Sequence, residues 1–117
     1  MAEAAVLLSD YGAKLFHLHF NDNYRSWDDD MIVGSVHLVE FVELWFWLKE
    51  LGYQGWYSMD QYPYREDGQG ALRASVEFLT SIDEILDDAA RAELRAIIGR
   101  GDPLESTAWI RGKLFRR

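Results

Sequence analysis

Two short apolar segments on either side of a longer one constrain the fold of this chain most. "KLFHLHFN" (residues 14–21) and "QGWYSMDQYP" (residues 54–63) are rich in aromatic and apolar residues and too short for helices, so both are predicted strands. Between them, a helix is predicted from a cap at Ser35 to about Leu51, with Gly52 ending it. Strand, helix and strand in this order form a βαβ unit, whose right-handed crossover makes the strands parallel.

The rest of the chain is predicted to be helical. Residues 1–13 contain a helix that Gly12 ends, residues 14–60 contain the βαβ unit, and residues 70–117 contain further helices. Capping signals mark the later helix starts, at Asp87 or Asp88 and at Asp102, Pro103 and Glu105. Because no repeat, low-complexity tract or linker interrupts the sequence, we predict an α/β protein with one domain over residues 1–117.

The composition restricts the classes of partner. Twelve Lys and Arg against twenty Asp and Glu give a formal charge of −8, which opposes binding to nucleic acid or anionic membranes and favours cations or neutral polar ligands. With no cysteine, a metal would need nitrogen and oxygen ligands. Glu40 and Glu43 interrupt the longest apolar stretch, and the first residues do not resemble an export signal, so a cytoplasmic protein is expected.

The first strand has one apolar and one polar face. Alternation places Phe16, Leu18 and Phe20 on one side, and His17, His19 and Asn21 on the other. Strands of buried parallel sheets are usually apolar on both faces, so a face with two histidines is predicted to line a site. His19 and Asp60 end the two strands, and ligands of such sheets bind at the carboxyl ends of strands. From the residues alone, Asp60 is either a ligand or a cap.

The loop after the first strand, "HFNDNYRSWDDD" (residues 19–30), is the most acidic part of the chain. In an extended backbone, Asp28 and Asp30 face the same way and Asp29 faces the other. Two such carboxylates repel unless a cation neutralises them, and hard divalent ions bind carboxylate oxygens. A solvated turn has the same composition, so both interpretations remain open.

Other side chains near the strand ends are candidates for binding or for packing. His19 adds an imidazole ligand that favours Mn²⁺ or Co²⁺. His17 is assigned either a structural hydrogen bond or the orientation of a neighbouring side chain. His37 is expected to be a surface or packing residue. The aromatic residues near the same rim are predicted either to stack on a sugar ring or to pack in the core, and they are Trp27, Trp56 and Tyr62.

Residues 15–88 resemble the last two strand and helix units of the xylose isomerase-like barrels, which include xylose and L-rhamnose isomerases. Four segments match in order, namely "LFHLHFN", "DDDMIVGS", "FWLKELGYQG" and "SMDQYPYRED". The first and last resemble the seventh and eighth strands of these (β/α)8 TIM barrels. The second resembles the loop with an Asp-x-Asp metal pair, and the third the seventh helix.

The resemblance implies a function and a site. It implies that His19 and Asp60 bind a structural divalent metal, and that Asp28 and Asp30 bind a catalytic one, Mn²⁺ or else Mg²⁺ or Co²⁺. Histidine at position 19 is more similar to L-rhamnose isomerases. The implied activity is aldose–ketose isomerisation of a monosaccharide, with Trp27 and Tyr62 as candidate contacts to the sugar.

The resemblance also implies that this chain is an incomplete barrel. The remaining ligands and catalytic groups of the family should precede residue 1, so we expect the carboxyl-terminal part of a sugar isomerase, inactive alone. Two strands cannot close a barrel, and the open surface around Trp45, Trp47 and Trp56 predicts a homo-oligomer. The alternatives are a non-catalytic oligomerising interaction module and a fragment of a sugar epimerase.

Overall fold

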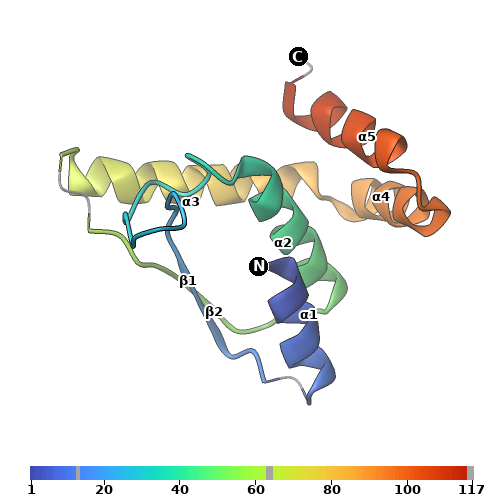
Figure 1. Cartoon of the computed structure of the whole chain (residues 1–117), viewed down its shortest axis with the longest axis horizontal. Coiled ribbons are helices and arrows are strands. Elements are labelled where there is room, and N and C mark those ends of the chain that lie inside the picture. The colour runs from blue at the N-terminus through green and yellow to red at the C-terminus, as the bar shows by residue number, and fades with distance from the viewer. Residues whose placement is uncertain (13, 63–64, 116–117) are drawn as a thin grey trace. The chain divides into compact units, whose positions relative to one another are not determined.

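The computed structural model describes residues 1–12, 14–62 and 65–115, which form five helices and one two-stranded sheet (Figure 1). The elements, in chain order, are α1 (Ala2–Asp10), β1 (His17–Phe20), α2 (Leu38–Glu50), β2 (Trp56–Met59), α3 (Gly68–Ile85), α4 (Asp88–Arg100) and α5 (Pro103–Phe115). The predicted α/β class is confirmed. Among the described helices, none has both the length and the apolar character needed to cross a membrane.

The chain divides into two compact units, Met1–Ile82 and Asp83–Arg117. The first contains the βαβ unit together with α1 and most of α3, and the second contains α4 and α5. The single domain expected over residues 1–117 stays a prediction. Every candidate site residue belongs to the first unit.

The two strands pair in parallel, as the βαβ order predicts. His17 is opposite Trp56, and His19 is opposite Ser58. The pairing continues beyond β2, because the Asp60 N–H donates to the Phe20 carbonyl at 2.9 Å. Residues 19–21 and 58–60 therefore leave the sheet side by side at one end, which is where the sequence placed the candidate site.

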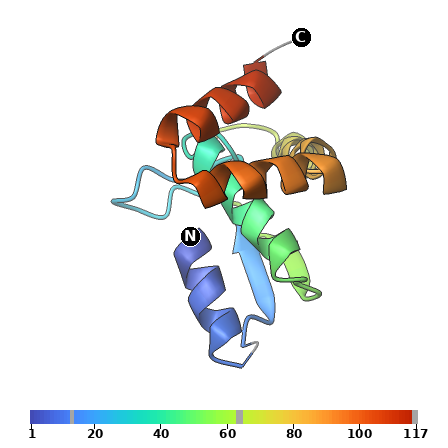
Figure 2. The ribbon, with the colours of Figure 1, turned by 90° about the vertical axis from the view of Figure 1, so that its right-hand side faces the viewer.

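The apolar face of the sheet packs against α2. Phe20 is buried, and its ring lies 6.1–6.2 Å from the rings of Phe41 and Trp45 on that helix. The other side of the same core is α1, which runs beside α2 (Figures 1 and 2). Helix α2 is apolar on most of its circumference, because the sheet and α1 both pack against it. Its buried residues are Phe41, Val42, Leu44, Phe46 and Leu48.

The predicted start of α2 is wrong. The helix begins at Leu38 after His37, and Ser35 does not cap it, because the Ser35 hydroxyl donates to the Ile32 carbonyl at 2.6 Å. The backbone N–H groups of Val36 and His37 instead donate to the carboxylate of Asp22, at 2.8 and 3.0 Å. A carboxylate remote in sequence thus takes the place of the local cap.

The helices of the second unit begin where the sequence predicts. Asp87 accepts a hydrogen bond from the Ala90 N–H at 2.8 Å at the start of α4, which ends at the left-handed Gly101 (φ 71°). Asp102 accepts from the Leu104 N–H at 2.8 Å, and Pro103 is the first residue of α5. Side-chain caps and a glycine stop are local signals, which explains why these boundaries could be predicted.

Candidate functional site

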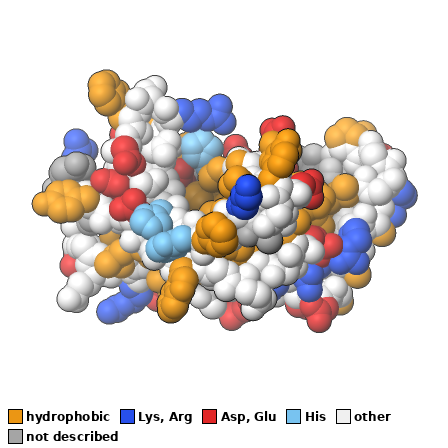
Figure 3. Space-filling model, turned by 90° about the horizontal axis from the view of Figure 1, so that it is seen from below, with side chains coloured by type: hydrophobic (Ala, Val, Ile, Leu, Met, Phe, Trp, Pro, Cys, Tyr) orange, Lys and Arg blue, Asp and Glu red, His pale blue; other side chains and the backbone are white. Residues whose placement is uncertain are grey.

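The polar face of the sheet is assembled by the strand register. Paired residues in a parallel sheet point to the same side, so the polar face combines His17 and His19 of β1 with Trp56 and Ser58 of β2. Asn21 and Asp60 follow directly after the two strands. The predicted alternation is observed within β1, where Leu18 and Phe20 are less exposed than His17 and His19. Phe16, which was predicted on the apolar face, precedes the strand and is 73% exposed. Figure 3 shows histidine side chains beside acidic ones on one surface of the molecule.

His17 has a partner on β2, and His19 has one directly after that strand. The Nε2 atom of His17 lies 2.7 Å from the Ser58 hydroxyl, which is the structural hydrogen bond that the sequence suggested. The Nδ1 atom of His19 lies 3.4 Å from Oδ2 of Asp60. The two imidazole rings are in edge contact with centroids 4.4 Å apart, so His17 supports the ring of His19.

The His19–Asp60 pair is open to solvent. The side chains are 55% and 63% exposed, respectively, and their 3.4 Å separation is long for a hydrogen bond. Both side chains can therefore turn toward a ligand without leaving a buried polar group unpaired. The arrangement offers one imidazole nitrogen and one carboxylate at the carboxyl ends of neighbouring strands.

Asp28 and Asp30 converge on the side-chain amide of Asn21. The Asn21 Nδ2 group donates to Oδ1 of Asp28 at 2.9 Å and to Oδ1 of Asp30 at 3.2 Å. Asp29 faces elsewhere and accepts from the Tyr24 N–H at 2.8 Å. The predicted orientation of the three aspartates is observed, but its predicted cause is wrong, since Asp30 has a left-handed backbone (φ 50°) and not an extended one.

The aromatic residues predicted at the rim are exposed. Trp27 is 80% exposed, Trp56 78% and Tyr62 71%. Trp27 belongs to the acidic loop, Trp56 to the polar face of β2, and Tyr62 follows Asp60 by two residues. Their exposure removes the core-packing alternative for these three side chains.

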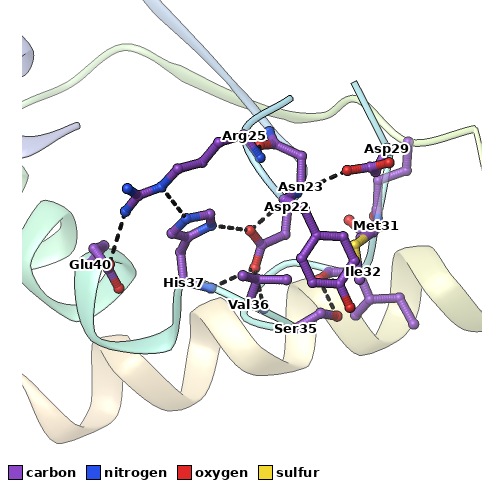
Figure 4. Close-up of polar contacts among 12 residues, drawn as sticks. Asp22, Asn23, Arg25, Asp29, Met31, Ile32, Ser35, Val36, His37 and Glu40 are labelled. Atoms are coloured by element: carbon purple, nitrogen blue, oxygen red, sulfur yellow. Dashed lines mark hydrogen bonds and ion pairs between the residues drawn. The ribbon is translucent and has the colours of Figure 1, made fainter. Parts of the chain in front are cut away.

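Asp22 is the buried charged residue beside this site that the sequence reasoning missed. It is buried (2% exposed), and its two carboxylate oxygens accept four hydrogen bonds of 2.7–3.0 Å (Figure 4). The donors are the backbone N–H groups of Asn23, Val36 and His37 and the His37 imidazole. Period-two alternation already puts residue 22 on the side of Phe16, Leu18 and Phe20, and a carboxylate on an apolar side requires buried partners.

The pKa of Asp22 reflects these contacts. Burial alone raises the pKa of this carboxyl, because it penalises the charged form. The hydrogen bonds from His37, Val36 and Asn23 outweigh burial, and they lower the pKa of Asp22 below its ordinary value of 3.8. Asp22 is therefore ionised at neutral pH although it lies inside the protein.

His37 is not the surface or packing residue that the sequence suggested. Its Nδ1 atom lies 2.7 Å from Oδ1 of Asp22, so that nitrogen must carry the proton and donate it. On the opposite side of the ring, Arg25 donates from Nε to Nε2 of His37 at 3.3 Å (Figure 4). A neutral imidazole with the proton on Nδ1 satisfies both contacts.

The donor atoms fit a divalent cation only in part. His19 and Asp60 offer one imidazole nitrogen and one carboxylate, and Asp28 and Asp30 offer two carboxylates. Mn²⁺ and Mg²⁺ bind ligands of these kinds. Across residues 1–12, 14–62 and 65–115, no three His, Cys, Asp or Glu side chains are grouped so as to hold a metal ion. Each pair would therefore need ligands that these residues do not supply.

Two comparisons with known proteins found no match for this chain. No protein family matches the sequence, and no curated protein matches it. The functional assignment therefore depends on the residues and their geometry.

Proposed function

We propose that this chain is the carboxyl-terminal part of a xylose isomerase-like (β/α)8 barrel of the L-rhamnose isomerase type. One observation carries the proposal. Two pairs of candidate ligands, His19 with Asp60 and Asp28 with Asp30, lie where two parallel strands end and on the polar side of their sheet. In barrels of this kind, that end of the strands forms the active site.

In the proposed enzyme each pair has a separate task. His19 and Asp60 would contribute to one divalent site, and Asp28 and Asp30 to the other. Bound divalent ions would stabilise negative charge that develops on sugar oxygens during aldose–ketose isomerisation. Asn21 orients the second pair through its amide, and Trp27 and Tyr62 offer exposed rings to a monosaccharide.

We also propose that the isolated chain is catalytically inactive. Each pair has two ligands, whereas divalent ions bound for catalysis usually have more, and a two-stranded sheet encloses no barrel interior. We expect no turnover of L-rhamnose or D-xylose, and turnover above the blank would contradict this. Coding sequence upstream of Met1 tests the origin of the chain, because an in-frame continuation with Glu and His ligands on predicted strands is expected.

Isothermal titration with Mn²⁺ tests the residual metal sites. The wild-type chain is expected to give binding heats that the Asp28→Ala, Asp30→Ala double variant reduces. The Glu77→Ala, Glu84→Ala double variant is the matched control, because it removes two exposed carboxylates of α3 and the same total charge. Negligible heats for the wild type, or equal heats for it and the aspartate variant, would remove the proposed site.

A second proposal, a homo-oligomerising module, is favoured by the surface of the sheet. Of the three tryptophans expected on the open surface, Trp56 is exposed, whereas Trp45 and Trp47 are half-buried. Phe16 is also exposed, and within the described residues no third strand joins β1 or β2. Unpaired strand edges and exposed aromatic rings are surfaces that a second copy of the chain can cover. Light scattering after size exclusion tests it, since a stable monomer at micromolar concentration would count against this module.

A further inference from the structure

One residue, Asp22, makes hydrogen bonds to both the middle and the end of the loop between β1 and α2, and so closes that loop. The Asp22 N–H donates to the Met31 carbonyl at 3.0 Å, and the Met31 N–H donates back to the Asp22 carbonyl at 2.9 Å. The Asp22 side chain then binds Val36 and His37, which immediately precede α2. Main chain and side chain of Asp22 thus fix two points of the loop, nine and about fifteen residues further along the chain.

These contacts specify one conformation of the Asp22 side chain. Each carboxylate oxygen accepts two of the four hydrogen bonds, one oxygen from Asn23 and the His37 ring and the other from the Val36 and His37 backbone. A side chain that is buried and has both oxygens satisfied cannot rotate without leaving N–H donors unpaired. Asp22 is therefore a rigid anchor.

The metal-pair candidates lie inside the segment that Asp22 closes. Arg25 (φ 78°) and Asp30 (φ 50°) have left-handed backbones, which non-glycine residues keep only where the surrounding structure imposes them. Asp28 is exposed, and the amide of Asn21 is its partner. The carboxylates of Asp28 and Asp30 are therefore held in place by few hydrogen bonds of their own.

We propose that Asp22 is a positioning residue that, through His37 and the closed loop, sets where the carboxylates of Asp28 and Asp30 lie. As far as it concerns a metal ion, this inference rests on the proposed function. As far as it concerns the shape of the loop, it stands by itself. The alternative is that Asp22 only stabilises the start of α2 and has no effect on the aspartate pair.

Nuclear magnetic resonance separates these two roles without any metal. The side-chain amide signals of Asn21 report its bonds to Asp28 and Asp30, and the backbone N–H of Tyr24 reports its bond to Asp29. The Asp28→Ala, Asp30→Ala double variant provides a reference, because in it neither carboxylate accepts a hydrogen bond from the Asn21 amide. We expect Asp22→Asn to shift the Asn21 signals toward that reference and to move the Tyr24 signal.

Two His37 variants guard against loss of folding in Asp22→Asn. His37→Asn keeps a side-chain N–H donor for Asp22, whereas His37→Leu removes it. The Asn21 signals are expected to stay near the wild-type positions in His37→Asn and to move in His37→Leu. Leu94→Ala is the control for general destabilisation, because it opens a buried position in the second unit, and it should leave the Asn21 signals unmoved.

Titration with Mn²⁺ alone then extends the test to metal binding. Asp22→Asn is expected to bind Mn²⁺ about tenfold to a hundredfold more weakly than the wild type, the loss typical of groups that orient metal ligands. If the wild type binds no Mn²⁺, the proposed function fails while the Asn21 signals still decide the positioning role. Unmoved Asn21 signals in folded Asp22→Asn, or in both His37 variants if Asp22→Asn does not fold, would overturn the inference.

Discussion

Two histidine–aspartate pairs of the first unit show how differently the same two residue types behave. In the Asp22–His37 pair the contact is 2.7 Å and the side chains are 1% and 16% exposed. In the His19–Asp60 pair the closest atoms are 3.4 Å apart and both side chains are more than half exposed. The buried pair has many further hydrogen bonds, so it holds structure, whereas the exposed pair remains available to a ligand.

The comparison also teaches where function can be sought. A buried carboxylate whose oxygens are all satisfied has no capacity left for a ligand, and moving it is costly. An exposed pair with a long contact contributes little to folding and can exchange partners. An exposed, loosely paired side chain and a buried, fully hydrogen-bonded one thus lie only three residues apart, at His19 and Asp22.

The largest expected effect comes from removing the buried carboxylate. Asp22→Ala leaves four donors without their acceptor, and we expect it to lower the free energy of unfolding by about 3 kcal/mol. Urea denaturation followed by circular dichroism measures the loss. A loss below about 1 kcal/mol would contradict the anchoring role of Asp22.

Removing the partner imidazole should have a smaller effect. His37→Leu deletes one of the four donors but keeps the three backbone N–H groups on the Asp22 carboxylate, so a loss of about 1–2 kcal/mol is expected. The same urea experiment applies. His37→Asn is the matched control and should retain most of the stability, because its amide can donate to Asp22.

Acid should reduce the contribution of the Asp22–His37 pair to stability, because the pKa of Asp22 is lowered in the folded protein. A carboxyl whose pKa is lower in the folded than in the unfolded protein stabilises the fold above the unfolded value, about 3.9. That contribution is lost as the pH falls through the folded pKa. Below about pH 4, the stability difference between wild type and Asp22→Asn should therefore shrink, and a constant difference would contradict this assignment.

The smallest effect is expected at the exposed pair. His19→Ala and Asp60→Ala should each change the free energy of unfolding by at most about 0.5 kcal/mol, since exposed ion pairs contribute little. A double-mutant cycle between them measures their coupling. Coupling above about 1 kcal/mol would show that this pair is structural like the other, and the comparison would fail.

Sequence alone determined the local features of this protein. Apolar alternation assigned the polar face of β1, and the βαβ order gave the parallel pairing. Gly12, Asp87 and Asp102 marked helix boundaries through contacts within a few residues. Such features could be predicted because backbone geometry and short-range hydrogen bonds specify them.

The tertiary structure decided how the loop is held. The Asp22 side chain contacts His37, which lies fifteen residues later in the sequence. With this contact in place, α2 begins at Leu38 and not after a cap at Ser35, as the sequence predicted. The tertiary structure also decided that Asp28 and Asp30 converge through a left-handed backbone at Asp30. The physical reason is that a buried charge takes whichever donors surround it in space, and spacing in the sequence does not reveal them.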